Sequence, residues 1–233
     1  MHKVEIPRSI IERVLARRPA LHWLDAMEGP RTAHIVVDLQ NGFMAPGQIA
    51  EIPEAREIVP NVNRISAAVR AAGGLNVFIQ NTVYPDTETT WSNWFMRQSA
   101  ERRAKSKEAF IAGSFGHALW PGLEITPEDI KVPKSRFGAF VPGASDLHTI
   151  LQARRIDTLI VTGTATNVCC ESTARDAMML NYKVAFVSDG TATHSDVEHN
   201  ATLGNLIANF ADVMTTDEIV TLLAKEARSE AAE

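Results

Sequence analysis

Cysteine is scarce in this 233-residue chain, which holds only two, adjacent to each other at Cys169 and Cys170. Neighbouring cysteines supply neither a disulfide framework nor the CxxC pairs of a structural zinc site. A chain without a disulfide framework is typical of a reducing compartment, so the sequence predicts a cytoplasmic location.

Long apolar runs and an excess of positive charge are missing as well. No run approaches the roughly 20 residues that a membrane-spanning helix needs, and residues 1–20 show no signal-peptide pattern. The formal net charge is -5, with Lys and Arg spread along the chain. The sequence therefore argues against both a nucleic-acid surface and a membrane as partners.

Short apolar runs alternate with segments of helical periodicity along most of the chain. Strands are predicted at residues 34–39, 75–81, 130–134, 157–163, 183–189 and 212–216, and helices at 61–74, 144–156, 167–181, 196–211 and 215–227. This alternation predicts an α/β fold, with a doubly wound, mainly parallel sheet and helices on both faces. Residues 1–233 are interpreted as a single domain, in which 84–128 form a helical excursion or lid.

Three polar residues follow predicted strands at the edge where parallel sheets place their sites. They are Asp38, Lys134 and Cys169. A helix N-terminus lowers the pKa of a thiol, a carboxylate can take the thiol proton, and a lysine can hold the carboxylate. The turn GTAT at 163–166 offers backbone N–H groups to an oxyanion. Together they indicate a thiol acyl-transfer site, although singly they are compatible with a turn, an exposed lysine and a core cysteine.

The stretches VVDLQNGF, VPKSRFGAF and GTATNVCCESTARDA resemble, in order, the motifs of the isochorismatase-like cysteine hydrolase family. The resemblance runs over a core at about 32–225, leaving 1–31 as an N-terminal extension. It implies a Rossmann-like sheet, a small-molecule substrate as the partner, and an Asp–Lys–Cys triad that cleaves amide-type C–N bonds. By position, Asp38 is the general base or acid, Lys134 its cationic partner, and Cys169 the nucleophile that forms a thioester.

The resemblance also concerns the residues around the nucleophile. It implies a cis peptide between Thr164 and Ala165, and an oxyanion hole made by the N–H groups of Ala165 and Cys169. Cys170 stands where the family commonly has an apolar residue, so it is interpreted as a core residue.

The branch of the family is suggested by what the chain has and lacks. Isochorismatases lack the nucleophilic cysteine, which this chain has. Nicotinamidases add a metal site built on an Asp-x-His pair, whereas residues 79–91 contain no histidine, so we expect no metal and no cofactor. The stretch FIQNTVY and the motifs above most resemble ureidoacrylate amidohydrolases, within the branch that cleaves ureido and carbamoyl compounds and releases ammonia.

In this interpretation Asn81 hydrogen-bonds the urea group of the substrate, although it is equally compatible with a capping residue at a strand end. Candidates for an apolar pocket lining, each also compatible with core or subunit packing, are Phe43, Trp91, Trp94 and Phe140. Candidates to neutralise a substrate carboxylate are Arg97, Arg102 and Arg103. Asn205 is a weaker pocket candidate.

Three alternatives stay open. The chain is also compatible with a hydrolase of a plain carboxamide such as maleamate or nicotinamide. A binding or scaffold homologue is disfavoured by the intact triad, and a redox cysteine pair by the roughly 100° between adjacent helical residues. The resemblance further implies a homo-oligomer, with a tetramer preferred over a dimer and with 84–128 and 6–18 as contact surfaces.

Overall fold

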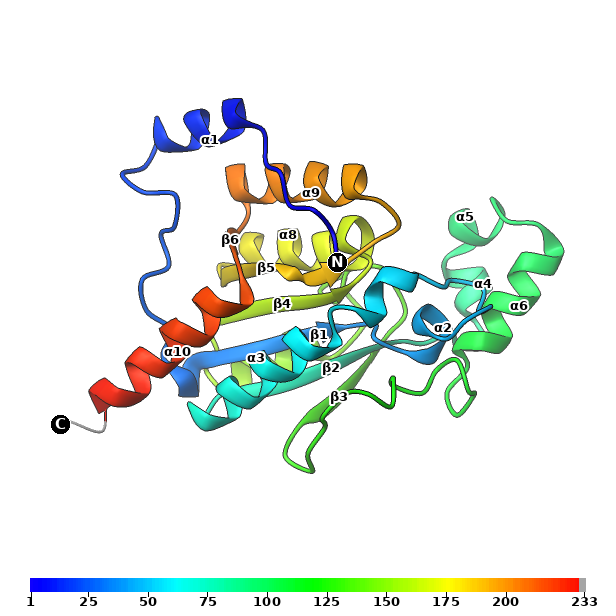
Figure 1. The fold of residues 1–233 in the computed structure, drawn as a ribbon. Coiled ribbons are helices and arrows are strands. Elements are labelled where there is room, and N and C mark those ends of the chain that lie inside the picture. Colours follow the sequence, from blue (N-terminus) through cyan, green and yellow to red (C-terminus); the bar gives the residue numbers. More distant parts are fainter. Residues whose placement is uncertain (231–233) are drawn as a thin grey trace.

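Six parallel strands form one sheet in the computed structural model, which describes residues 1–230 (Figure 1). The strands are β1 Thr32–Val37, β2 Leu75–Asn81, β3 Ile130–Lys134, β4 Thr158–Thr164, β5 Lys183–Ala192 and β6 Asp212–Met214. Their order across the sheet is β3-β2-β1-β4-β5-β6. This is the order of a doubly wound Rossmann fold, so the predicted fold class is confirmed.

Helices cover both faces of this sheet, with α3 and α10 over one face and α8 and α9 over the other (Figure 1). The helices are α1 Arg8–Leu15, α2 Asn41–Met44, α3 Val59–Ala71, α4 Thr87–Thr90, α5 Ser92–Phe95, α6 Ala100–Phe110, α7 Leu147–Ala153, α8 Glu171–Met179, α9 Asp196–Asn209 and α10 Thr216–Glu230. Short turns η1 Gly29–Arg31 and η2 Pro53–Arg56 and the π-helical turn η3 Thr166–Cys170 complete the elements. None of the helices within residues 1–230 is long and apolar enough to cross a bilayer.

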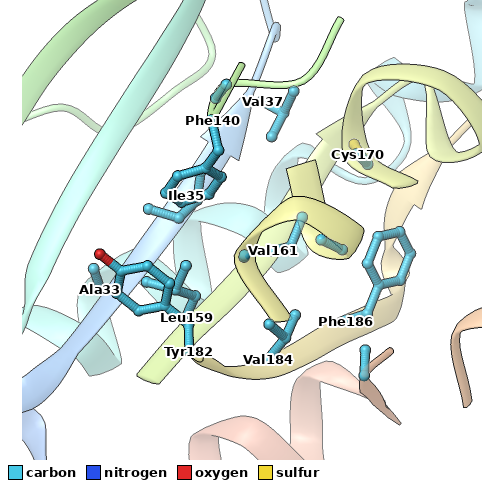
Figure 2. Close-up of a cluster of buried hydrophobic side chains, with 14 of the residues drawn as sticks. Ala33, Ile35, Val37, Phe140, Leu159, Val161, Cys170, Tyr182, Val184 and Phe186 are labelled. Atoms are coloured by element: carbon cyan, nitrogen blue, oxygen red, sulfur yellow. The ribbon is translucent and has the colours of Figure 1, made fainter. Parts of the chain in front are cut away.

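The central strands are buried on both faces, which explains their continuous apolar sequence. Every residue of β1 and β4 is buried. Ile35 and Val161 pack on the side of α8 and α9 (Figure 2). Ile160 packs against Ile65 and Ile219 on the side of α3 and α10. Alternate residues of a strand thus fill two separate cores, as the pleat of a strand requires.

The N-terminal extension adds a helix that the strand–helix pattern did not predict. Helix α1 lies along α9 (Figure 1), and Ile6, Ile10 and Ile11 pack against the core beneath it. Gly204 of α9 leaves room for this contact, because a Cβ there would lie 2.8 Å from Ile10 Cδ1. These three side chains are therefore packed on the chain itself, whereas Leu15 is exposed. Whether 6–18 also form a subunit contact stays a prediction.

The excursion at 84–128 is helical as predicted, since it contains α4, α5 and α6. It extends beyond the carboxyl edge of the sheet (Figure 1). Whether it acts as a lid or as a subunit contact stays a prediction.

We expect Gly163→Ala to lower the free energy of unfolding by at least about 3 kcal/mol, because backbone strain and overpacking add. Gly163 has a φ of 113°, and a Cβ would lie 2.1 Å from the carbonyl oxygen of Val37 in β1. Gly143 is the matched control, with a φ of 76° and open space around it. Gly143→Ala should lose only about 1–2 kcal/mol, so equal losses in urea unfolding would contradict this prediction.

Candidate active site

The carboxyl ends of β1, β3 and β4 bring Asp38, Lys134 and Cys169 together at one edge of the sheet. Asp38 follows β1 with a φ of 54°, and its N–H donates to the Ile79 carbonyl of β2 at 3.1 Å. Lys134 is the last residue of β3, and Cys169 lies in η3 directly after β4. The strand order reverses between β1 and β4, which is where doubly wound sheets form their ligand sites.

Lys134 contacts both other residues of this group. Its Nζ donates to Asp38 Oδ2 at 2.7 Å and lies 3.7 Å from Cys169 Sγ. The side chains of Asp38 and Lys134 are completely buried, and Cys169 is 5% exposed. The second carboxylate oxygen, Asp38 Oδ1, accepts no hydrogen bond from the part of the chain that the structure describes.

Burial and charge together set the protonation states. Burial raises the pKa of Asp38, and the Lys134 ammonium opposes that shift. Burial works to lower the pKa of Lys134, but the charges of Asp38 and Cys169 outweigh it and the pKa is raised. Burial also raises the pKa of the Cys169 thiol, against the effect of Lys134. The resting site is therefore a neutral thiol beside an ion pair.

The raised thiol pKa corrects the sequence argument that a helix N-terminus would lower it. Cys169 lies in the π-helical turn before α8 and is enclosed, so desolvation of a thiolate raises the thiol pKa and outweighs the opposing charge of Lys134. Transfer of the thiol proton to Asp38 would leave a thiolate beside the Lys134 ammonium. The three groups sum to zero charge before and after this transfer, so it buries no additional net charge.

The turn around Cys169 has the cis peptide that the resemblance implied, between Thr164 and Ala165. The oxyanion hole made by the N–H groups of Ala165 and Cys169 stays a prediction. The Ala165 carbonyl accepts hydrogen bonds from the N–H groups of Val168 and Cys170, both at 3.1 Å. Cys170 itself is fully buried in the core (Figure 2), with its Sγ 3.8 Å from the Thr162 carbonyl oxygen. Its interpretation as a core residue is confirmed.

A cavity of about 110 Å³ lies next to the ends of β2 and β3, and Asp38, Lys134 and Cys169 are not among its lining residues. It reaches Asn81, which pairs with Lys134 in the register of the two strands, and Ser135. Four predicted substrate-binding residues line it, namely Phe43, Asn81, Trp91 and Trp94. The cavity is small beside the about 300–1,000 Å³ of drug-sized pockets, so it suits a small substrate.

Aromatic rings form one wall of this cavity. The rings of Trp91 and Trp94 both meet Phe137 edge-on, with centroids 4.8 and 5.0 Å away. Phe137 was not singled out from the sequence, although it lies within the motif VPKSRFGAF. These rings make this wall of the cavity apolar.

Two predicted residues lie elsewhere. Phe140 is not among the lining residues, because its ring packs in the core 5.6 Å from the Tyr182 ring (Figure 2). Asn205 also lies outside this lining, and its Nδ2 donates to Glu171 Oε1 at 3.2 Å.

The three candidate arginines have different positions. Arg102 lines the cavity and is exposed, so it lies where the cavity meets solvent. Its guanidinium forms none of the ion pairs found within residues 1–230, and its one contact is a 3.5 Å approach to the Ile49 carbonyl. Arg103 pairs with Glu88 at 3.6 Å, and Arg97 is not among the lining residues.

Sequence reasoning missed two glutamines at this site. Gln98 lines the cavity together with Arg102 and Ser106. Arg102 and Ser106 lie four residues apart on α6, whereas Gln98 precedes the Ser99 cap of that helix, so helical spacing would not have identified it. The Oε1 of Gln98 is buried and accepts no hydrogen bond within the described chain. Gln40 holds the backbone of Asn81, accepting from its N–H at 2.7 Å and donating to its carbonyl at 3.1 Å.

The Asn81 carboxamide makes no hydrogen bond to another group in residues 1–230, so it caps no helix there. It is thus free to meet a ligand in the cavity. No cluster of three or more His, Cys, Asp or Glu side chains in the same residues is placed to bind a metal ion.

The fold and this site define a doubly wound α/β protein with a carboxylate, an ammonium and a thiol in contact at the carboxyl edge of its sheet. The isochorismatase domain matches residues 32–218, and the chain belongs to this family. The family predicted from the sequence motifs is therefore confirmed.

Two relatives and one solved structure show which members of the family this chain resembles. The ureidoacrylate amidohydrolase RutB of Variovorax paradoxus (strain S110) is 35% identical over 94% of this chain and 90% of its own. The RutB of Pseudomonas savastanoi pv. phaseolicola (strain 1448A / Race 6) is 32% identical over 94% and 93%. Among solved structures, a cysteine hydrolase from Pseudomonas syringae pv. phaseolicola 1448A superposes with a TM-score of 0.76 at 26% identity. The superposition covers 90% of this chain and 99% of the chain of that cysteine hydrolase.

We expect Lys134→Met to lower the free energy of unfolding by about 3–5 kcal/mol, because it leaves a carboxylate buried without its partner. The double variant Asp38→Asn, Lys134→Met should recover most of that loss, since no ion then remains to be desolvated. Urea unfolding of the wild type, Asp38→Asn, Lys134→Met and the double variant measures the coupling free energy between the two side chains. Additive losses would show that the two side chains do not stabilise each other.

Proposed function

We propose that this chain is a cysteine-dependent amidohydrolase that cleaves a C–N bond of a small ureido or carbamoyl compound and releases ammonia. The observation that carries the proposal is the contact of Lys134 Nζ with both Asp38 Oδ2 and Cys169 Sγ, beside a small aromatic cavity. Membership of the family and the RutB relatives support hydrolysis of amide-type bonds.

The first half of the proposed reaction forms an acyl-enzyme. Asp38 takes the proton of Cys169 Sγ, and the thiolate attacks the carbonyl carbon of the substrate. Lys134 remains an ammonium and stabilises the thiolate, while the N–H groups of Ala165 and Cys169 stabilise the oxyanion. Asp38 then returns the proton to the departing nitrogen, the C–N bond breaks, and ammonia leaves a thioester on Cys169.

Water completes the reaction. It gives a proton to Asp38 as its oxygen attacks the thioester carbon, and the thiolate leaves and regains that proton. With a ureido substrate the released acid is a carbamate, which decomposes to an amine and carbon dioxide without the enzyme. Asp38 accepts and returns one proton in each half-reaction, so the site ends in its starting state.

The cavity favours a ureido group over a plain carboxamide. A ureido group carries N–H donors on both sides of its carbonyl. The carboxamide of Asn81 and the buried, unpartnered Oε1 of Gln98 offer two separate amide groups to it. The Arg102 guanidinium, which forms none of the ion pairs found within residues 1–230, lies at the mouth of the cavity. We therefore infer a planar ureido substrate that bears a carboxylate.

The redox alternative receives less support from the surroundings of the two sulfurs. Cys169 Sγ faces Lys134 Nζ, whereas Cys170 Sγ faces the Thr162 carbonyl within the core. A homo-oligomer, with a tetramer preferred, and a cytoplasmic location stay predictions.

Cys169→Ala should abolish hydrolysis, while Cys170→Ala should retain activity, because only the first sulfur contacts the ion pair. Ammonia release would be measured for ureidoacrylate, N-carbamoyl amino acids, biuret, maleamate and nicotinamide. Turnover of a ureido compound that is lost only in Cys169→Ala is the expected result. Turnover of plain amides alone would refute the substrate class, and an active Cys169→Ala would refute the nucleophile.

Arg102→Gln should raise KM for a carboxylate-bearing ureido substrate by about tenfold, the low end for a hydrogen bond to a charged group. The KM for neutral biuret should stay unchanged, since it has no carboxylate to bind. Arg97→Gln is the control, because this neighbouring arginine is exposed and does not line the cavity. Equal effects of the two variants, or equal effects on both substrates, would rule out carboxylate recognition by Arg102.

A further inference from the structure

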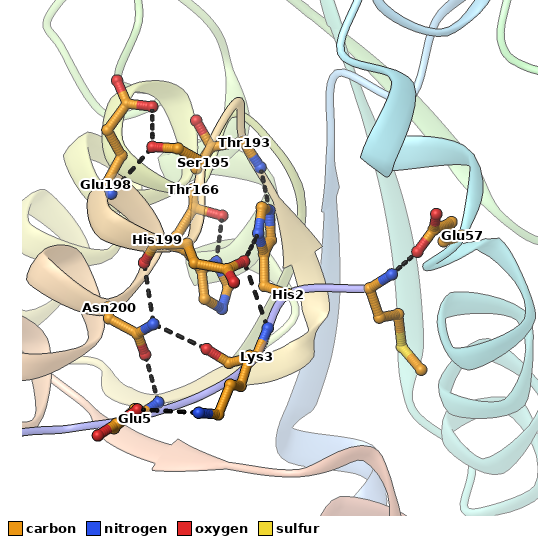
Figure 3. Close-up of polar contacts among 12 residues, drawn as sticks. His2, Lys3, Glu5, Glu57, Thr166, Thr193, Ser195, Glu198, His199 and Asn200 are labelled. Carbon is orange, nitrogen blue, oxygen red and sulfur yellow. Dashed lines mark hydrogen bonds and ion pairs between the residues drawn. The ribbon is translucent and has the colours of Figure 1, made fainter.

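The first residues of the chain lie across the end of β5 and the start of α9, close to the turn that carries Cys169 (Figure 3). Asn200 of α9 holds this segment from both sides. Its Oδ1 accepts from the Glu5 N–H at 2.6 Å, and its Nδ2 donates to the Lys3 carbonyl at 2.8 Å. The segment is thus fixed to the fold by its own backbone.

His2 points from this segment into the protein, and its side chain is only 4% exposed. The Thr193 N–H donates to its Nε2 at 3.1 Å, and its Nδ1 lies 2.8 Å from Asp196 Oδ1. Because Nε2 accepts a hydrogen bond, the ring proton is on Nδ1 and is donated to Asp196. Both ring nitrogens are therefore used, and they fix the orientation of the ring.

The His2 ring stacks on His199, with centroids 4.5 Å apart and an interplanar angle of 21°. His199 is completely buried, and burial lowers its pKa to about 4, so it is neutral near pH 7. Its Nε2 lies 3.0 Å from the Ser188 carbonyl and donates to it. Its Nδ1 then accepts from the Thr166 hydroxyl, also at 3.0 Å.

Two series of contacts, here called routes, connect His2 to the turn η3. In the first, His2 stacks on His199, and His199 hydrogen-bonds Thr166, the residue after Ala165. The second runs through Thr193, whose N–H binds His2 and whose hydroxyl donates to Asn167 Oδ1 at 2.7 Å. Both routes end on the first two residues of the turn that carries Cys169. Figure 3 shows the contacts of His2 with Thr193 and of His199 with Thr166.

We propose that His2 is a positioning residue, which holds the turn from Ala165 to Cys169 in place through His199 and Thr193. This inference rests on the proposed function, because that turn supplies the nucleophile and the N–H donors for the oxyanion. Such donors act only if they are already in place when charge develops. A displaced turn should therefore lower kcat and kcat/KM together and leave KM nearly unchanged.

Three variants of the full chain test this proposal. His2→Ala removes the stacking and both ring hydrogen bonds, and should lower kcat by about tenfold or more, as small misplacements in active sites do. His2→Gln retains an acceptor and a donor on a side chain of similar length, and should restore part of kcat. Lys3→Ala is the control, because the Lys3 side chain is 80% exposed and, among the residues that the structure describes, forms an ion pair only with Glu5. A wild-type kcat in His2→Ala, or an equal loss in Lys3→Ala, would overturn the proposal.

Hydrogen exchange gives a readout that does not depend on turnover. Peptides that cover residues 163–170 should exchange faster in His2→Ala than in wild type or Lys3→Ala, while peptides from β1 serve as an internal reference. Unchanged exchange at 163–170 would overturn the positioning role. If the wild type hydrolyses no substrate, the proposed function fails, and the exchange experiment still decides whether His2 holds the turn.

Discussion

The buried ion pair between Asp38 and Lys134 is the interaction on which the rest of the site depends. Its two side chains have no contact with solvent and lie 2.7 Å apart. Each would be costly to bury alone, and each is tolerated because the other is present. The pair constrains the ends of β1 and β3 to one position at the carboxyl edge of the sheet. In the proposed reaction, the pair also gives the neighbouring thiol a base and a counter-charge.

The buried pair explains why a thiol with a raised pKa is compatible with the proposed chemistry. A thiolate without a counter-charge would be costly to desolvate in this enclosed place, and burial raises the pKa of Cys169. Lys134 supplies the opposite charge within 3.7 Å of the sulfur. A thiolate that forms only by proton transfer to Asp38 avoids a permanently charged, oxidation-prone cysteine. The neighbouring Cys170 has no such partner and remains part of the core.

Chemistry and recognition come from different parts of the molecule. The three proposed catalytic side chains lie at the ends of buried strands, where packing fixes them. Most of the cavity lining comes from the helical excursion at 84–128, which includes Trp91, Trp94 and Arg102. An excursion outside the sheet can vary without disturbing the ion pair. The N-terminal segment has a third proposed role, because the contacts of His2 position the turn that carries the proposed nucleophile.

Much of this protein could be predicted from the sequence alone. Strand and helix periodicity is a local property, so the alternating pattern predicted all six strands, with ends that differ by a few residues. The three motifs placed Asp38, Lys134 and Cys169 at strand ends, and parallel strands bring such ends to one edge. Cys170 was distinguished from Cys169 in the same way, by its position in the motif.

Other features depended on tertiary packing. Which arginine reaches the cavity, the burial of Phe140 and the raised pKa of Cys169 follow from how distant segments enclose a side chain. Helix α1 and the contacts of His2 link the start of the chain to α9, almost 200 residues later. Periodicity and short motifs describe neighbours along the chain, whereas desolvation and cavity shape depend on neighbours in space. The sequence therefore indicated the chemistry of this site, and the packing determined its electrostatics and its proposed selectivity.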